Sequence, residues 1–233
     1  MARLAELAKA QNHTGLAISF AGWIDADGQG ISAGPNLGWG AEKLNEIAGS
    51  HDLSCHLEND LDARAWGEWL ALSSDQQQRG DLMVINAGSG FALGLVMSEQ
   101  LVRGVHRRAG EIGHLRTSSQ ALCGCGTRGC IETLLGGAHH QPDSWNQPGF
   151  EAQWIGQAVR YLAPVITALD PAHIIATGGI LDHRSGLVER LNEALVEVLP
   201  KAWWANLKLT RSRGGEELAR RGVVELAQSA QRG

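Results

Sequence analysis

The sequence has few of the features that mark membrane, secreted or nucleic-acid-binding proteins. It contains no run of about 18 apolar residues, so no segment is expected to span a bilayer. Lysine and arginine number 20 against 25 aspartate and glutamate residues, and a net charge of −5 leaves no basic footprint for nucleic acid. The basic pairs Arg107-Arg108 and Arg220-Arg221 are expected on the solvated surface. Residues 1–10 have an amphipathic helical pattern rather than that of a signal peptide, so we expect a cytoplasmic protein.

Cysteine is scarce, but its placement is informative. Of four cysteines, Cys123, Cys125 and Cys130 lie close together in a glycine-rich stretch with His114 upstream, and Cys55 is expected to be a buried core residue. Three thiolates and an imidazole are ligands that tetrahedral zinc prefers. The alternative is a loop of buried or disulfide-linked cysteines, but a Cys-x-Cys disulfide is strained and requires an oxidising compartment. The pattern predicts a structural zinc whose four positions are filled by these side chains.

Segments typical of strands and of helices alternate along the chain. Strands are expected at 15–20, 54–57, 82–86, 92–97, 173–176 and near Leu207. Helices are expected near 41–48, after residue 60, and at 150–169, 186–199 and 215–229. This alternation indicates an α/β protein.

Residues 109–137 resemble the zinc motif of the ROK family, named for its repressors, open reading frames and sugar kinases. They read Ala-Gly-Glu-Ile-Gly-His, then Cys-Gly-Cys-Gly-x-x-Gly-Cys-x-Glu-Thr, then a glycine pair. The resemblance extends to Ile18–Asp25, Pro35–Trp39, Glu58–Asp60 and Ile174–Ile180. It implies an actin- or hexokinase-like fold, in which two ribonuclease-H-like lobes close over a sugar.

The resemblance also implies a domain organisation. Residues 1–80 are expected to be the remnant of the first lobe, and residues 81–233 the second lobe with a zinc segment at 110–137. The last helix, at about 215–229, is expected to pack back on the first lobe. The family's opening hairpin with Asp-x-Gly-x-Thr is not found in this sequence, so we expect an N-terminally truncated member with an incomplete first lobe. Members are commonly dimers, so a homodimer is expected.

Roles for single residues follow from the same resemblance. Asp60 matches the family's general base, which accepts a proton from a sugar hydroxyl during phosphoryl transfer. The matching sugar contacts are Asn59, Asp60, Glu111, His114, Glu132 and Asn36. His114 would bind zinc through one ring nitrogen and face the sugar with the other. Asp60 could instead cap a helix, and Asn36 could be a plain turn residue.

The positions that would face a nucleotide match the ROK pattern less well than the sugar-facing positions do. The candidate contacts are Gly88, Ser89, Gly90, Gly178 and Gly179. Ala92 and Thr177 stand where the family has glycines, and glycine-rich turns also serve ordinary hairpins. ATP and magnesium are therefore expected only if the chain is a kinase.

Three functions are compatible with these patterns. The first is a non-catalytic, sugar-recognising protein of the transcriptional-regulator type, because the sugar-facing positions match better than the ATP-facing ones. No helix-turn-helix precedes the sugar domain in this sequence, so direct nucleic-acid binding is not expected. The second is an ATP-dependent kinase of a hexose or N-acetylhexosamine, represented by a truncated chain. The third is a zinc-stabilised interaction domain.

Overall fold

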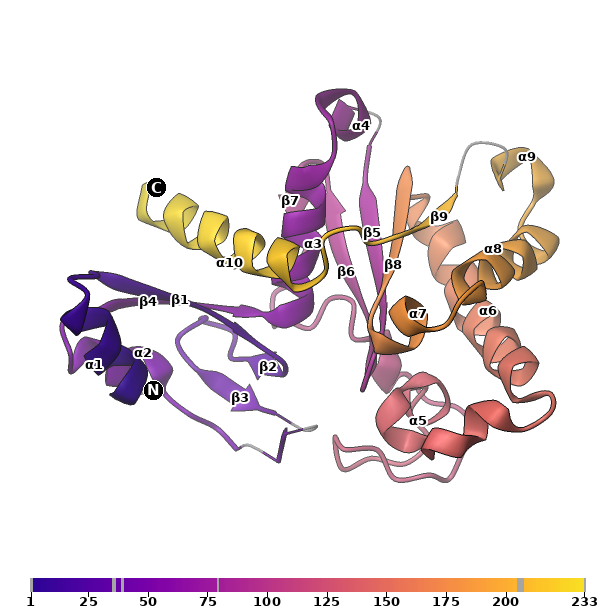
Figure 1. Cartoon of the computed structure of the whole chain (residues 1–233), viewed down its shortest axis with the longest axis horizontal. Helices are drawn as coiled ribbons and strands as arrows, with labels where there is room; N and C mark the ends of the chain where they lie inside the picture. The colour runs from indigo at the N-terminus through magenta and orange to yellow at the C-terminus, as the bar shows by residue number, and fades with distance from the viewer. Residues whose placement is uncertain (1, 35–36, 39, 79, 205–207, 233) are drawn as a thin grey trace. The chain divides into compact units, whose positions relative to one another are not determined.

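The computed structural model of the chain describes residues 2–34, 37–38, 40–78, 80–204 and 208–232. Its internal contacts divide the chain into two compact units, whose elements are labelled in Figure 1. Unit 1 comprises residues 1–72, 101–109 and 214–233, and unit 2 comprises residues 73–100 and 110–213. The chain therefore changes unit after residues 72, 100, 109 and 213, whereas the sequence predicted a division after residue 80 with the last helix packing back on the first lobe.

Unit 1 contains a small parallel sheet with helices on both faces. β1 (Gly15–Phe20) pairs with β4 (Ser54–Asn59) along the full length of both strands. β2 (Trp23–Ile24) and β3 (Ile31–Ala33) form a short antiparallel pair after β1. The helices are α1 (Ala2–Ala10), α2 (Leu44–Gly49), α3 (Asp60–Ala71) and α10 (Gly215–Arg232). In Figure 1, α10 lies on one side of the β1–β4 pair, and α1 and α2 lie on the other.

Alternation along β1 and β4 places apolar side chains on the face that α1 and α2 cover. The cluster nearer α2 comprises Phe20, Ile24, Ile31, Leu44 and Leu57. The cluster nearer α1 comprises Ala5, Ala8, Ala48 and Leu53, with Leu16 and Cys55 packed against it. Cys55 is half-buried rather than fully buried as predicted, because it lies at the edge of this smaller cluster. Burial nevertheless raises the pKa of its thiol.

The opposite face of this sheet is covered by α3 and α10, which approach each other closely. Gly67 of α3 and Gly222 of α10 are both buried at this helix contact. A Cβ atom on Gly67 would overlap the carbonyl oxygen of Leu218, and one on Gly222 would overlap that of Ala63. Only glycine permits this separation of the two helix backbones, so the contact depends on both residues.

Unit 2 is built on a five-stranded sheet in the order β7-β6-β5-β8-β9. The strands are β5 (Leu82–Ala87), β6 (Phe91–Met97), β7 (Gln100–Leu101), β8 (His173–Thr177) and β9 (Leu209–Arg211). β5 pairs antiparallel with β6 and parallel with β8, which is parallel to β9. β5 is a nearly continuous apolar run because both of its faces are covered.

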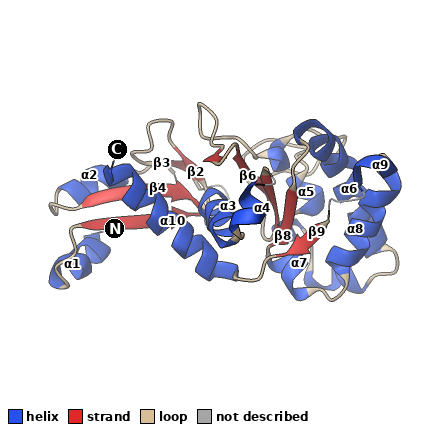
Figure 2. Cartoon of the chain, turned by 90° about the horizontal axis from the view of Figure 1, so that it is seen from above, coloured by secondary structure: helices blue, strands red, loops and turns tan. Residues whose placement is uncertain are grey.

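Two helices of unit 2, α6 (Phe150–Leu169) and α8 (Leu187–Val198), lie on the β9 side of this sheet, and α9 (Lys201–Trp204) lies farther out, next to α8 (Figure 2). Shorter helices are α4 (Ser74–Gln78), α5 (Glu132–Leu135) and α7 (Gly179–His183). Short 3-10 turns are η2 (Ile112–His114), η3 (Gly137–His139) and η4 (Pro142–Asn146). The predicted bounds of β1 and α6 agree with the structure. Leu207 lies outside the described residues, and the strand expected near it begins at Leu209.

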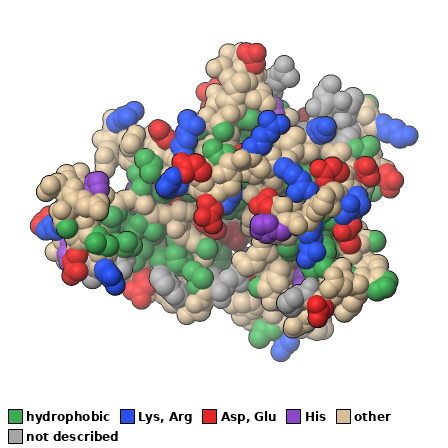
Figure 3. Space-filling view, viewed as in Figure 1, with side chains coloured by type: hydrophobic (Ala, Val, Ile, Leu, Met, Phe, Trp, Pro, Cys, Tyr) green, Lys and Arg blue, Asp and Glu red, His purple; other side chains and the backbone are tan. Residues whose placement is uncertain are grey.

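One face of the molecule shows where apolar and charged side chains gather. Figure 3 shows apolar side chains gathered over the α1 and β1 region of unit 1, and acidic and basic side chains intermixed over unit 2. In α1, Leu4 and Leu7 are each 52% exposed. No helix within the described ranges has the length and apolar character that crossing a bilayer requires.

Candidate functional site

The first candidate residues lie where β4 passes into α3, at a helix cap. Asn59 has an extended backbone, and its Oδ1 accepts hydrogen bonds from the amides of Leu61 at 2.9 Å and Asp62 at 3.1 Å. Its Nδ2 donates to the carbonyl of Gly22 at 3.0 Å. A side-chain cap of this kind contributes about 1 kcal/mol and holds the asparagine in one orientation.

Asp60 is the first residue of α3, directly after this cap. The capping role that the sequence left open for Asp60 therefore belongs to Asn59. Asp60 is solvent-exposed, although protein atoms crowd around its carboxyl. This partial desolvation raises the pKa of Asp60, against the opposing effects of backbone amides and the charge of Arg64. An accessible carboxylate of this kind can accept a proton from a hydroxyl, and its role as general base stays a prediction.

In unit 2, Glu111 and His114 lie at the two ends of the η2 turn. Nε2 of His114 lies 3.6 Å from the carboxylate of Glu111, and Nδ1 lies 3.7 Å from Sγ of Cys123. The imidazole therefore directs one nitrogen toward the cysteines and the other toward Glu111. That His114 binds zinc with one nitrogen and faces a sugar with the other stays a prediction.

The η2 turn is fixed by its contact with β6. The Gly110 carbonyl accepts a hydrogen bond from the Leu93 amide at 2.8 Å. At Gly113, which is buried, a Cβ atom would overlap the Phe91 carbonyl oxygen. Backbone contact with a central strand holds Glu111 and the imidazole in place before any ligand binds.

The four predicted metal ligands lie together. Nδ1 of His114 and the sulfurs of Cys123, Cys125 and Cys130 are all within 4.8 Å of one another. The sulfurs of Cys125 and Cys130 are 3.6 Å apart, near the roughly 3.7 Å expected for two thiolates on tetrahedral zinc with bonds of about 2.3 Å. Gly129, at φ 80°, allows the tight turn before Cys130. The cluster could hold a metal ion, and its donor set fits zinc.

The thiols of this cluster differ in how readily they ionise. Burial raises the pKa of Cys123. Burial acts in the same direction on Cys125, but hydrogen bonds involving Thr127 outweigh it and lower the pKa to about 7. Because metals bind the thiolate form, Cys125 is better prepared for a metal than Cys123.

Glu132 begins α5 and is buried beside the cysteines. Its Oε2 accepts a hydrogen bond from the Phe91 amide at 3.3 Å, and its Oε1 lies 3.6 Å from Cys123 Sγ and 3.9 Å from His139 Nε2. Cys123, Glu132 and His139 form a second possible set of metal ligands, but Cys123 also belongs to the larger set. Both oxygens of Glu132 have neighbours within unit 2, so its contact with a sugar stays a prediction.

The predicted nucleotide contacts meet at the ends of two neighbouring strands. Gly88, Ser89 and Gly90 form the turn from β5 to β6, and Gly178 and Gly179 follow β8, which pairs with β5. A Cβ atom on Gly88 would lie 3.7 Å from the Gly179 amide nitrogen. The carboxyl ends of parallel strands are where α/β proteins bind ligands. Two segments more than 80 residues apart therefore form one surface.

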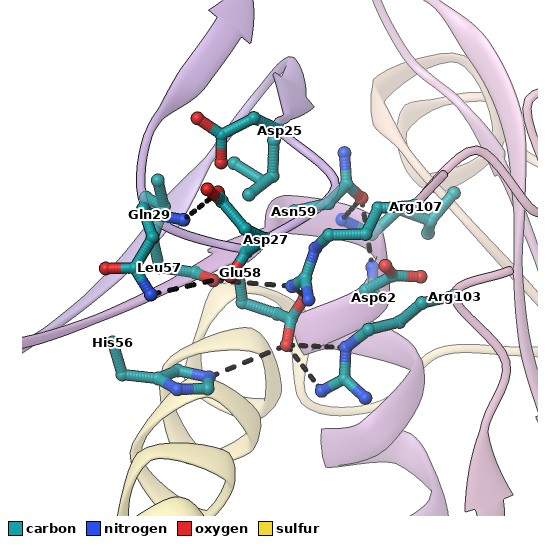
Figure 4. Close-up of polar contacts among 12 residues, drawn as sticks. Asp25, Asp27, Gln29, His56, Leu57, Glu58, Asn59, Asp62, Arg103 and Arg107 are labelled. Atoms are coloured by element: carbon teal, nitrogen blue, oxygen red, sulfur yellow. Dashed lines mark hydrogen bonds and ion pairs between the residues drawn. The ribbon is translucent and has the colours of Figure 1, made fainter. Parts of the chain in front are cut away.

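A charged cluster in unit 1 was not predicted (Figure 4). Glu58 is fully buried, and its carboxylate accepts hydrogen bonds from Arg103 at 2.5 and 3.0 Å and from Arg107 at 2.5 Å. Nε2 of His56 lies 3.5 Å from the same carboxylate. Burial favours the neutral acid, but His56, both hydrogen-bonded arginines and their charges outweigh it and lower the pKa of Glu58 to about 2.

The expectation that Arg107 and Arg108 are solvated is therefore wrong. The Arg107 side chain is only 17% exposed, and Arg108 donates to the Ile24 carbonyl and to Ser32 Oγ, both at 2.7 Å. Their partners are far away in sequence, so a local pattern does not reveal them. The available signal was Glu58, an acidic residue inside a predicted strand segment next to the apolar Leu57.

The structure brings the candidates together in two groups. Asn59 and Asp60 are adjacent in unit 1, whereas Glu111, His114 and Glu132 surround the cysteines in unit 2. Asn36, the remaining sugar candidate, lies outside the described residues.

Comparison with known proteins places this architecture among sugar kinases and regulators. N-acetylmannosamine kinase of Yersinia pestis is 36% identical over 100 residues, which are 42% of this chain and 33% of that protein. The chain thus matches about a third of the length of this curated relative. A ROK glucokinase from Streptomyces griseus, in complex with glucose and AMPPNP, has a similar fold, with a TM-score of 0.77 and 21% identity over 97% of this chain and 88% of the other.

A ROK transcriptional regulator, a homologue of the Escherichia coli MLC protein, has the same fold, with a TM-score of 0.76 and 19% identity over 97% of this chain and 65% of that chain. The structural likeness to kinases and to a regulator shows a fold that both classes share. The profile of the ROK family matches residues 3–149, well over half of the sequence. This chain therefore belongs to the ROK family.

Proposed function

We propose that this chain recognises a sugar and acts as a non-catalytic sensor of the regulator type. The observation that carries the proposal is the orientation of His114, whose Nε2 faces Glu111 at 3.6 Å while its Nδ1 faces Cys123 at 3.7 Å. A metal at the cysteines would lock the imidazole and leave one nitrogen and a carboxylate for sugar hydroxyls. Asn59 and Asp60 are further sugar contacts that the family resemblance implies.

The metal in this proposal is a structural zinc held by His114, Cys123, Cys125 and Cys130. Four protein ligands fill a tetrahedral site and leave no position for substrate, so the ion would supply rigidity rather than reaction chemistry. The segment it organises carries Glu111 and Glu132, two of the proposed sugar contacts.

The nucleotide positions support sensing over catalysis. Thr177 stands where the ROK pattern has glycine. It is fully buried, and its hydroxyl lies 3.5 Å from the Asp182 carboxylate. Asp182 also accepts a hydrogen bond from the Gly178 amide at 3.0 Å. These groups are already satisfied within unit 2, and phosphoryl transfer depends on accurate positioning of the donor.

A kinase is the second candidate, and two observations favour it. Asp60 is an accessible carboxylate at the position of the family's base, and the Gly88 and Gly178–Gly179 segments converge at the carboxyl ends of β5 and β8. In this alternative, Asp60 accepts the proton of a hexose or N-acetylhexosamine hydroxyl, with ATP and magnesium as co-substrates.

One experiment separates these functions. The chain is titrated calorimetrically with glucose, N-acetylmannosamine and related sugars, and the same samples are tested in an ATP-coupled phosphorylation assay. Sugar binding without turnover supports the sensor. Asp75→Asn, a change at an exposed aspartate, is the control. Turnover that is lost in Asp60→Asn but kept in this control would show that the chain is a kinase and not a sensor. If no sugar binds and no sugar raises the Tm, the zinc-stabilised interaction domain is the remaining function.

A further inference from the structure

Glu58 lies at the centre of a group of side chains here called the arginine hub: Glu58, Arg103, Arg107 and Arg108. Each carboxylate oxygen of Glu58 has an arginine partner, Arg103 on Oε2 and Arg107 on Oε1. A fully buried carboxylate requires such partners to remain charged. The short hydrogen bonds therefore join two segments that lie some 45 residues apart in sequence.

The arginines come from a segment that returns to unit 1 between two stretches of unit 2. Residues 101–109 belong to unit 1, whereas residues 73–100 and 110–213 belong to unit 2. The turn closes on itself through hydrogen bonds from the Arg107 amide to the Gly104 carbonyl and from the Ala109 amide to the Arg103 carbonyl. Arg107 adopts φ 54°, a left-handed conformation that non-glycine residues avoid. Such strain persists only where the surrounding contacts impose it.

Arg108 attaches the same segment to the β2–β3 pair. Its guanidinium donates to the Ile24 carbonyl and to Ser32 Oγ, both at 2.7 Å, and lies 5.3 Å from the centre of the Trp23 ring. The hub therefore holds residues 101–109 against both the end of β4 and the β2–β3 pair.

The residues next to the hub in sequence are the proposed sugar contacts. Asn59 and Asp60 directly follow Glu58, and Glu111 is the second residue after Ala109. We propose that the arginine hub is a positioning device for Asn59 and Asp60, which fixes the end of the strand that carries them against residues 101–109. This inference rests on the proposed sugar recognition. None of the hub residues needs to touch the sugar.

The test uses Glu58→Gln, which keeps the size of the side chain but removes the charge that both arginines bind. Arg220→Gln is the matched control, because Arg220 is exposed and pairs only with the exposed Glu217 among the described residues. Hydrogen exchange is measured by mass spectrometry on peptides covering residues 101–116 and on peptides from β5, in the absence of sugar. Sugar affinity is then measured by calorimetry with the sugar that the wild type binds.

The expected result for Glu58→Gln is faster exchange across 101–116, unchanged exchange in β5, and sugar affinity at least tenfold weaker. Arg220→Gln should match the wild type in all three measurements. A folded Glu58→Gln protein with a lower Tm but unchanged exchange at 101–109, or with unchanged affinity, would overturn the positioning role. If the wild type binds no sugar, the proposed function fails, and the exchange data alone decide whether the hub holds the segment.

Arg108→Lys covers the case in which Glu58→Gln does not fold. It leaves Glu58 paired but cannot reproduce the two guanidinium contacts with Ile24 and Ser32. Faster exchange at 101–116 with weaker sugar binding is again expected. Exchange and affinity equal to those of the wild type would overturn the proposal.

Discussion

Acid should weaken unit 1 largely through one carboxylate, that of Glu58. The pKa of Glu58 is about 2 in the folded protein, against 4.5 for an ordinary glutamate. Because the folded-state pKa is the lower one, the unfolded chain binds the proton first as the pH falls. The stabilisation is therefore fully present above about pH 4.5 and is lost as the pH falls towards 2. At about 1.4 kcal/mol per pH unit, the gap corresponds to about 3 kcal/mol of unfolding free energy.

Other carboxylates also titrate in this range, so the contribution of Glu58 is read as a difference from Glu58→Gln. Urea unfolding is followed between pH 6 and pH 2 on chelator-treated protein, with pulsed hydrogen exchange reporting β1 and β4 peptides. At neutral pH the variant should be less stable by about 3–5 kcal/mol, the usual cost of removing one member of a buried ion pair. The two proteins should converge in stability as the pH approaches 2. Parallel curves, with a constant difference at every pH, would refute the assignment of this carboxylate.

Three other outcomes are expected. Removal of metal by a chelator, or Cys125→Ser, should abolish sugar binding and increase hydrogen exchange across residues 110–137; retained affinity in a metal-free sample would contradict this. Gly222→Ala should lower the unfolding free energy by about 1–3 kcal/mol in urea, because its Cβ would overlap the Ala63 carbonyl. The control is Gly156→Ala, because a Cβ there meets open space on α6; its unfolding free energy should be unchanged or higher by up to about 1 kcal/mol. Equal losses of unfolding free energy in both variants would argue against the helix contact. Light scattering should show self-association, because among the described strands only β4 pairs with β1; a clean monomer at high concentration would exclude it.

Local patterns predicted the parts of the molecule that are local in sequence. The cysteine cluster was predictable because its four ligands lie within residues 114–130, and the glycines between the cysteines indicate a tight loop. β1 and α6 were predictable because apolar residues recur with the period of a strand or a helix. The capping residue was assigned less well, since Asn59 and Asp60 are both good helix caps and only the extended backbone of Asn59 distinguishes them.

The parts that escaped prediction depend on partners far away in sequence. Arg107 and Arg108 look like an ordinary surface pair until folding brings Glu58, Ile24 and Ser32 to them. The β2–β3 pair was missed because it contains only short strands, whose pattern is too brief to show a period. The return of residues 101–109 to unit 1 has no local signal, because the contacts that define it are all long-range.

The discontinuity of unit 1 has a consequence for how the chain is made. Every residue of unit 2 precedes α10, which contributes the last helix of unit 1. During synthesis, unit 2 can therefore be complete before α10 has been added. At that point the face of α3 that contains Gly67 has no helix packed against it. For the time that the ribosome needs to add α10, that face is exposed. A nascent chain paused at this stage is the form on which chaperones would act.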